Sequence, residues 1–410
     1  MTKVGRAEQV GADGPRTIFD AEDWQNGLIL NQYKAPKPIL ANAVTALRMS
    51  PEWEGVLAFN DFTIGTVMLN PAPWNQATPG AWSDHEDRLA CDWLQHNGIV
   101  VPVEIAGQAV QVVAKEKRFH PVREYLDSLG WDGKPRIDKF LNTYFGVEQG
   151  DYAAAVGSRW LISAVARIFQ PGCKADYCLI LGGPQGLLKS TALKTIAGEW
   201  FTDEIAELGS KDAALQTRGV WIIEIAELDS MSRAEVSKIK SFMSRSTDRF
   251  RPPYGRRPIE SPRQCVFAGS VNLETYLRDE TGARRFWPVA CQKILVDDLA
   301  RDRDQLWGEA LMRYREGKPW WLDSHELDKA AEEQQTDRYD EDPWQEPIQD
   351  YLAGRNDTSI TEILEKCIEK KKDLWTKADK NRVGGCLRRL KWERYRDRDG
   401  VEREYRWRHS

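Results

Sequence analysis

Hydrophobic residues in the middle of the chain follow two patterns that alternate along the sequence. Short uninterrupted apolar runs have the length and composition of buried strands, whereas longer stretches repeat apolar residues every three or four positions, as helices do. The strand-like runs are 177–181, 219–225 and 264–272, and the helix-like stretches are 152–169, 189–200 and 232–245. Strands that alternate with helices favour a parallel sheet, so we expect an α/β core over residues 151–335.

The segments that precede this core have patterns of their own. Residues 1–40 are polar and aperiodic, and we expect a mobile leader there. Residues 41–150 predict a mixed α+β region, in which the apolar stretch 100–114 favours two strands that turn at Ala106 and Gly107. Stretch 119–146 then predicts two helices separated by a break rich in glycine and proline.

The last segment, residues 343–410, predicts two helices followed by a hairpin over 392–407. The signals are a capping box of Ser359 and Glu362, an apolar helix face of Val383, Leu387 and Leu390, and a turn at Asp399 and Gly400. Two helices and a basic hairpin in this order fit a winged-helix-like domain.

Composition and charge narrow the class of protein. The net charge is −5, but residues 361–410 carry 16 Lys and Arg against 10 Asp and Glu, so a basic end of +6 follows a body of −11. This asymmetry indicates one surface for an anionic partner. The seven cysteines are scattered without a C-x-x-C pair, which disfavours a zinc site or a disulfide framework. We expect no signal peptide, no membrane span and a cytoplasmic protein.

Residues 182–191, GGPQGLLKST, match a phosphate-binding loop at every key position but one. In such loops backbone N–H groups between a strand and a helix wrap the phosphates, a lysine reaches them, and the next hydroxyl binds Mg²⁺. Leu188 stands where the pattern has glycine, and its Cβ would lie close to the phosphates. The alternative is a glycine-rich turn before a surface helix. The candidate ATP-binding residues are Gly183, Pro184, Gln185, Gly186, Leu187, Leu188, Lys189, Ser190 and Thr191.

Polar residues follow the next two predicted strands. Glu224 ends one of them, and Glu227 lies three positions further on. Carboxylates at this place can hold Mg²⁺ together with Ser190 and can orient an attacking water. Asn272 ends the third strand, where its amide could sense a γ-phosphate. The alternative is a buried strand that runs into an acidic helix.

Arg284 and Arg285 stand together in the stretch GARRFWPV. Arginine neutralises charge on a transferring phosphoryl group, from the same chain or from a neighbouring subunit. The alternative is a pair that binds the acidic body of the chain. In chain order these motifs favour a ring-forming ATPase. Its candidate catalytic residues are Lys189, Glu224, Glu227, Asn272, Arg284 and Arg285, and its candidate metal ligands are Ser190 and Glu224.

Taken together, six segments resemble the virulence-associated protein E family. They are HPVREYL with WDG, ARIFQPGCKAD, GPQGLLKST, WIIEIAEL, RSTDRFRPPYGRR and LRDETGARRFWPV, spread over roughly residues 42–288. The family comprises phage and prophage ATPases related to superfamily 3 helicases and D5-type primase-helicases. The resemblance implies an AAA+-like P-loop core, a hexamer, and action on DNA during replication in a bacterial host, with other replication proteins as candidate partners.

The same resemblance assigns roles by motif. Lys189 and Ser190 correspond to the phosphate loop, Glu224 and Glu227 to the Walker B region, and Asn272 to sensor 1, while Arg284 and Arg285 correspond to the arginine pair. The family usually has glycine before the lysine, so Leu188 bears on the rate of ATP turnover. No acidic primase-like cluster precedes the core, so priming activity is not expected.

Two basic segments are candidates for DNA contact. Stretch 245–257 places five arginines around one aspartate, where superfamily 3 helicases have a channel hairpin, although a solvated loop or a subunit contact fits as well. The winged-helix segment is the second, although acidic residues in its hairpin leave a protein contact open. The candidate residues are Arg249, Arg251, Tyr254, Arg256 and Arg257 in the first segment and Arg382, Arg388 and Arg389 in the second.

The leading function is therefore a DNA-dependent ATPase, a ring translocase or helicase that hydrolyses ATP with Mg²⁺. A second possibility is an ATP-gated DNA-binding or protein-interaction switch with little turnover, which Leu188 favours. A third is a regulator without nucleotide that acts through the winged helix alone. His120 fits a helix cap, and Lys174 and Asp176 fit either a nucleotide contact or a local ion pair.

Overall fold

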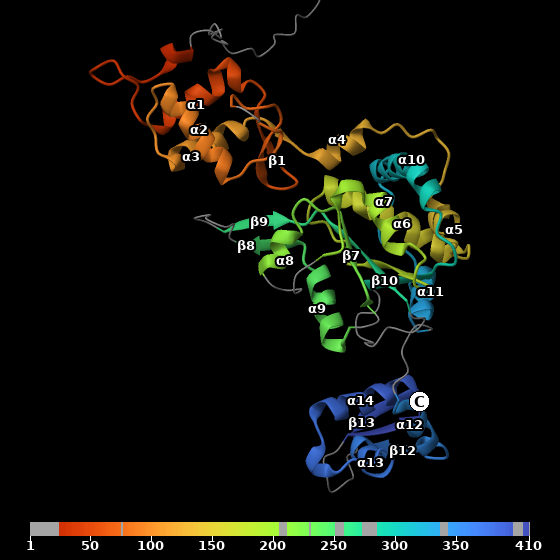
Figure 1. Cartoon of the computed structure of the whole chain (residues 1–410). Helices are drawn as coiled ribbons and strands as arrows, with labels where there is room; N and C mark the ends of the chain where they lie inside the picture. The colour runs from red at the N-terminus through yellow and green to blue at the C-terminus, as the bar shows by residue number, and fades with distance from the viewer. Residues whose placement is uncertain are drawn as a thin grey trace, which may run out of the picture. The chain divides into compact units, whose positions relative to one another are not determined.

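The computed structural model describes residues 24–74, 77–204, 211–228, 231–250, 258–272, 285–336, 343–396 and 405–409. It shows a mixed α/β protein with a parallel sheet, as the alternating patterns predicted. The chain divides into two compact units, a larger one that extends to Gln335 and a smaller one that begins at Thr336. Figure 1 shows the elements of both units.

The first part of the larger unit combines helices with a small sheet of order β3-β2-β1-β4. The helices are η1 (Trp24–Gly27), α1 (Leu40–Met49), η2 (Pro51–Trp53), α2 (Asp84–His96) and α3 (Val103–Ala114), and the strands are β1 (Leu57–Asn60), β2 (Gly65–Met68), β3 (Gly80–Ala81) and β4 (Arg118–Phe119). The buried Trp53 ring packs against the rings of Trp74, Trp82 and Trp93. Both element types expected here are present.

The strand pair predicted at 100–114 is wrong, because residues 103–114 form helix α3. Ala106, Ala109 and Val110 are fully buried at helical spacing, and α3 packs against α1 and α2. Gly107 does not make a turn: a Cβ there would lie 2.7 Å from Asp87 Oδ2 on α2. Close helix packing through small side chains therefore outweighs the strand preference of the valines.

The break predicted within 119–146 is confirmed. Helices α4 (Pro121–Ser128) and α5 (Phe140–Phe145) flank it, with η3 (Ile137–Lys139) leading into α5. His120 caps α4, since its Nδ1 accepts a hydrogen bond from the Arg123 N–H at 3.3 Å. Its other ring nitrogen contacts Gln264 Oε1 at 2.6 Å, and burial lowers the pKa of the imidazole.

A five-stranded parallel sheet of order β11-β5-β10-β7-β6 forms the centre of the larger unit. Its strands are β5 (Cys178–Gly182), β6 (Phe201–Thr202), β7 (Ile222–Ile225), β10 (Val266–Val271) and β11 (Phe286–Ala290). The helices are α6 (Asp151–Phe169), α7 (Lys189–Ala197), η4 (Gly198–Trp200), α8 (Lys211–Gln216), α9 (Arg233–Met243), α10 (Val296–Arg315) and α11 (His325–Thr336). Strands β8 (Thr247–Phe250) and β9 (Ile259–Pro262) form a separate antiparallel pair.

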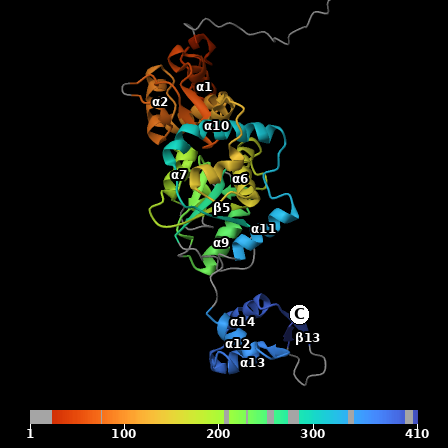
Figure 2. The ribbon, with the colours of Figure 1, turned by 90° about the vertical axis from the view of Figure 1, so that its right-hand side faces the viewer.

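Helices α6, α7 and α10 pack together on one face of this sheet, and α9 lies on the other (Figures 1 and 2). The tryptophans Trp160, Trp221 and Trp307 are fully buried in this core. Each indole N–H donates to a backbone oxygen at 2.9 Å, so these large side chains fill the core without an unsatisfied donor. The predicted capping box of Ser232 and Glu235 starts α9.

The smaller unit places helices against a three-stranded sheet of order β12-β14-β13. Its elements are α12 (Gln345–Leu352), β12 (Asp357–Ser359), α13 (Ile360–Lys366), η7 (Lys372–Leu374), α14 (Lys377–Arg389), β13 (Trp392–Arg396) and β14 (Tyr405–His409). The capping box of Ser359 is confirmed, and Val383 and Leu387 are fully buried. The turn predicted at residues 399–400 lies outside the described residues. Within the described part of the chain, no helix has the length and apolar composition to cross a bilayer.

Candidate functional site

The candidate site lies where the parallel strands of the central sheet end. Strand β5 ends at Gly182 and leads through loop 183–188 into α7. Strands β7 and β10 end at the same edge, because β10 lies between β5 and β7 and pairs in parallel with both. Ligands of open α/β sheets bind at this edge, outside the carboxyl ends of the strands.

The loop 183–188 adopts the backbone conformation of glycine at three positions. Gly183 has φ +151°, and a Cβ there would lie 2.8 Å from the Cys291 oxygen, so no other residue fits without a shift. Gly186 has φ +88°. Leu188 has φ +64° and ψ +31°, the left-handed conformation that costs an L-residue about 1–2 kcal/mol. Its side chain is 54% exposed. The main consequence of having leucine instead of glycine at position 188 is therefore a strained backbone.

Lys189 is buried against its own loop. Its Nζ donates to the backbone oxygens of Gly183 at 2.7 Å and Pro184 at 3.0 Å. It also donates to Asn272 Oδ1 at 3.1 Å, across 83 residues of sequence. The structure therefore brings together the lysine and the asparagine that the sequence placed in one site.

Glu224 forms the second half of the site. It is 2% exposed, and its Oε1 accepts hydrogen bonds from Ser190 Oγ at 2.7 Å and Ser270 Oγ at 2.6 Å. Its Oε2 is buried and has no hydrogen-bond partner within the described structure. Burial, with the charge of Glu224 nearby, raises the pKa of the Cys178 thiol well above its usual value. The carboxylate thus presents one oxygen held by two hydroxyls and one that is not held.

Ser270 is not among the site residues predicted from the sequence, although the strand pattern contains a signal for it. It precedes Asn272 by two positions on β10 and its continuation, and residues two apart on a strand share a face. A polar residue at this spacing before a predicted site residue could have identified it.

Two other candidates lie differently from this group. Glu227 is exposed in the turn after β7 and has φ +52°. Arg285 precedes β11, whose Phe286 pairs with Cys178 at the start of β5, so Arg285 lies at the opposite end of the sheet from the phosphate loop. Its Nε donates to Asp176 Oδ2 at 3.4 Å, so the ion pair of Asp176 is formed with Arg285, which is distant in sequence. Arg284 lies outside the described residues.

The core described above coincides with a known sequence family. A family model for the virulence-associated protein E-like domain matches residues 126–340, more than half of the chain. The chain belongs to this family. The matched range includes loop 183–188, Glu224 and Arg285, and the match confirms the family resemblance drawn from the sequence motifs.

The solved structures that resemble the chain include three of a protein region with low sequence identity to it. Three structures of the C-terminal region of NrS-1 have TM-scores of 0.44, 0.42 and 0.44 to this virulence-associated protein E-like chain, with sequence identities of 14%, 12% and 14%. The alignments cover 86% of this chain and 95% or 96% of the NrS-1 chains. Among curated proteins, none matches the sequence.

The first candidate DNA segment of this family member is described only in part. Arg249 is exposed on β8, which pairs antiparallel with β9, and both strands lie between β7 and β10 in the chain. The remaining candidates of this segment, Arg251, Tyr254, Arg256 and Arg257, lie outside the described residues. The base of the hairpin is fixed by a buried ion pair in which Arg263 donates to both carboxylate oxygens of Asp248 at 2.6 and 2.8 Å.

The candidates of the smaller unit all lie on α14. Arg388 is exposed, whereas the guanidinium of Arg382 lies 4.0 Å from the Trp344 ring centroid. The side chain of Arg389 is outside the described part of the structure. Arg388 is therefore the candidate here that the structure places at the surface.

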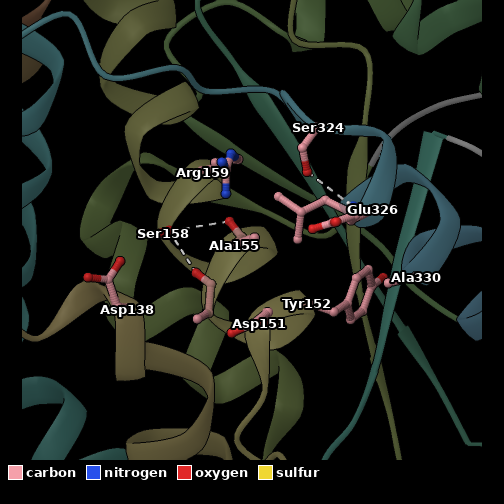
Figure 3. Close-up of a pocket in the computed structure, with 11 residues that line it drawn as sticks. Asp138, Asp151, Tyr152, Ala155, Ser158, Arg159, Ser324, Glu326 and Ala330 are labelled. Atoms are coloured by element: carbon pink, nitrogen blue, oxygen red, sulfur yellow. Dashed lines mark hydrogen bonds between the residues drawn. The ribbon is translucent and has the colours of Figure 1, made fainter.

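A cavity of about 480 Å³ lies between the start of α6 and α11 (Figure 3). Arg159 in its wall forms an ion pair with Asp323, and the Ser158 hydroxyl donates to backbone oxygens of its own helix. None of its lining residues belongs to the phosphate loop or to the ends of β7 and β10. The cavity is therefore separate from the candidate site.

Proposed function

We propose that this chain is a Mg²⁺-dependent ATPase that acts on DNA in a phage or prophage replication module. The observation that carries the proposal is the meeting of four predicted residues in two hydrogen-bonded pairs, Lys189 with Asn272 and Ser190 with Glu224. Each pair joins the start of α7 to the end of a neighbouring strand, as a P-loop ATPase core requires. The family and the parallel sheet support the same class.

The residues of the site fit a nucleotide with Mg²⁺. The amides of loop 183–188 would wrap the phosphates, and Lys189 would leave its loop oxygens for the phosphate oxygens. Glu224 Oε2 and the Ser190 hydroxyl are hard oxygen ligands of the type that Mg²⁺ prefers. Among the described residues no group of three or more His, Cys, Asp or Glu could hold a metal, so phosphate oxygens would complete the shell. When bound, Mg²⁺ neutralises charge on the phosphoryl group.

The remaining roles follow from where each residue stands. Asn272 would sense the γ-phosphate through the amide that now binds Lys189. Glu227 would orient the attacking water. Arg285, with Arg284, would complete the site of a neighbouring subunit, because strand register places Arg285 about 16 Å from its own phosphate loop at ~3.3 Å per residue. This geometry favours a ring-forming oligomer, and a hexamer is the proposed state.

DNA contact is proposed for the β8–β9 hairpin and for the smaller unit as a winged-helix-like domain. In the latter, α14 precedes the β13–β14 hairpin, and three-stranded pairing with β12 supports the winged-helix arrangement. The basic end of the chain is complementary to a DNA backbone. A replication role places the protein in the cytoplasm of the bacterial host, with other replication proteins as partners.

The deciding experiment measures ATP hydrolysis with and without single-stranded DNA. The native chain should hydrolyse ATP faster with DNA, and Lys189→Ala should remove this activity. Lys194→Ala is the matched control, since Lys194 is an exposed lysine on the same helix. Equal activity of native and Lys189→Ala protein, with or without DNA, would rule the proposal out.

A second candidate is a nucleotide-gated switch with little turnover. The left-handed backbone of Leu188 favours it, because strain beside the phosphates can hold the loop in one state. Tight ATP binding by the native chain, with negligible hydrolysis at saturating DNA, would select the switch over the motor.

A further inference from the structure

Ser270 makes a contact that a phosphate loop and a carboxylate do not by themselves require. Its hydroxyl donates to Glu224 Oε1 at 2.6 Å, the oxygen that also accepts from Ser190 at 2.7 Å. Glu224 is almost completely buried, so water does not replace either donor. The position of this carboxylate therefore depends on two hydroxyl groups from different elements.

Strand register explains how Ser270 reaches the carboxylate. Glu224 on β7 pairs with Ala268 on β10, and Ser270 is the next residue of β10 on the same face. Such diagonal neighbours on adjacent strands are within reach of a longer side chain such as glutamate. The side chain of Asn272 follows on this face and binds Lys189. The end of β10 thus contacts both halves of the site: Ser270 binds Glu224, and Asn272 binds Lys189.

The two hydroxyls leave the carboxylate with a defined orientation. Both donate to Oε1, and Oε2 is buried with no hydrogen-bond partner in the described structure. The Ser190 hydroxyl can keep its proton on Oε1 while its own oxygen lone pairs face a cation. Without Ser270, the carboxylate would be fixed only by Ser190, a residue that must itself adjust when a cation binds.

We propose that Ser270 is a positioning residue of the metal–nucleotide site, which orients Glu224 so that Oε2 faces the divalent cation. This inference rests on the proposed function, because it assumes that a nucleotide and a cation bind here. Groups that orient a metal ligand typically change metal affinity 10–100-fold when removed. Ser270 should therefore control cation affinity far more than nucleotide affinity.

The test uses the full chain with Mn²⁺ as a paramagnetic probe and a non-hydrolysable ATP analogue. Mn²⁺ affinity of the nucleotide complex is measured by electron paramagnetic resonance, and affinity for the fluorescent analogue is measured separately in EDTA. Ser270→Ala should weaken Mn²⁺ binding about 10-fold or more and change analogue binding in EDTA less than twofold. Ser270→Thr keeps the hydroxyl. The logarithm of its Mn²⁺ affinity should lie at least halfway from the value for Ser270→Ala to the native value.

The matched control is Ser163→Ala, which removes another buried hydroxyl, one that donates to the Trp160 oxygen on α6. It should leave Mn²⁺ affinity unchanged, and thermal unfolding of every variant reports whether it folds. Native Mn²⁺ affinity in Ser270→Ala, or an equal loss in Ser163→Ala, would overturn the positioning role alone. Failure of the native chain to bind the analogue at all would overturn the proposed function and this inference with it.

Discussion

The two ends of the central sheet hold their charged groups in different ways. At the carboxyl end, Lys189 and Glu224 are buried and bonded to groups of their own chain. At the amino end, Arg285 and Asp176 keep 23% and 19% of their side-chain surface exposed and meet at 3.4 Å. The first arrangement is preassembled, whereas the second is a partly exposed pair that costs little to separate.

In the proposed oligomer, this difference bears on which end of the sheet would meet a second copy of the chain. The carboxyl end brings the start of α7 together with the Glu224 carboxylate and the Asn272 amide of the same chain. The amino end holds an arginine beside a cavity of about 550 Å³ that is lined by Trp287, Trp320 and Trp321. Arg285 is partly exposed and lies at the end of the sheet away from loop 183–188, and for this reason we propose that it acts in a neighbour's site.

The largest effect that would test this contrast is expected from Arg285→Ala. ATP turnover should fall about 1000-fold, because an arginine supplied from a neighbour contributes that much to phosphoryl transfer. Nucleotide affinity should stay within twofold, since such an arginine acts mainly on the charge of the transition state. Steady-state turnover and equilibrium binding of a fluorescent nucleotide provide the two measurements.

A mixing experiment distinguishes a neighbour's arginine from a local one. Lys189→Ala and Arg285→Ala chains are each inactive alone but supply complementary halves at mixed interfaces. An equimolar mixture should recover a measurable part of native turnover. If the mixture stays as inactive as the separate variants while it still assembles, Arg285 does not act on a neighbour.

The second prediction concerns the buried ion pair before β10, near the amino end of the sheet. Asp248→Asn should lower the free energy of unfolding by about 3–5 kcal/mol, because it leaves the Arg263 charge buried without its carboxylate. Replacing both residues, as in Asp248→Leu with Arg263→Met, should recover most of the loss. Urea unfolding gives the values, with Asp298→Asn at the exposed Arg301 pair as a control expected to stay within about 0.5 kcal/mol. A loss as small as that of the control would contradict the structural role.

The third prediction concerns how the stability of the folded chain depends on pH through His120. Burial lowers the pKa of His120 in the folded chain, and Arg123 lowers it too, while the contact with Gln264 and the charge of Asp61 oppose this. The unfolded chain then binds a proton at higher pH than the folded chain does, near the usual pKa of about 6.5. The contribution of the neutral ring is complete above pH 6.5 and falls as the pH drops toward the folded pKa.

His120→Asn tests that assignment, because asparagine also caps helices but does not titrate. The native chain should lose more stability than His120→Asn between pH 7.5 and pH 5.5, measured by urea unfolding. Parallel pH profiles for the two proteins would show that another group is responsible. His120→Asn should not change how nucleotide affinity depends on pH, since His120 lies away from loop 183–188.

Much of this arrangement was predictable because it is encoded in short stretches. The apolar runs gave the parallel strands, and the capping residues Ser232 and Ser359 gave helix starts that the structure confirms. Helix α3 was mispredicted because its valines favour strands locally, whereas its small residues are explained only by contact with Asp87 on another helix. The sequence pattern of residues 100–114 contains no information about a contact with another helix.

The site shows the same limit. Glu224 lies near the end of β7, Asn272 follows β10, and Lys189 begins the helix that follows β5. A parallel sheet brings such positions together at one edge. The place of Arg285 depends on strand register, and the contact of Ser270 with Glu224 depends on which strand lies between two others. Strand order is a property of the whole sheet, so it cannot be predicted from any single motif.

The smallest predicted effect concerns Leu188, in the strained loop at the carboxyl end of the sheet. Leu188→Gly removes the left-handed strain of about 1–2 kcal/mol but adds about 0.5–1 kcal/mol of chain entropy to the unfolded state. The free energy of unfolding should therefore rise by about 0–1.5 kcal/mol. Leu188→Ala keeps a Cβ and should gain nothing. Urea unfolding and ATP turnover of the three proteins decide whether the strain limits catalysis: a several-fold faster Leu188→Gly would show that it does, whereas turnover equal to that of Leu188→Ala would confine the strain to stability.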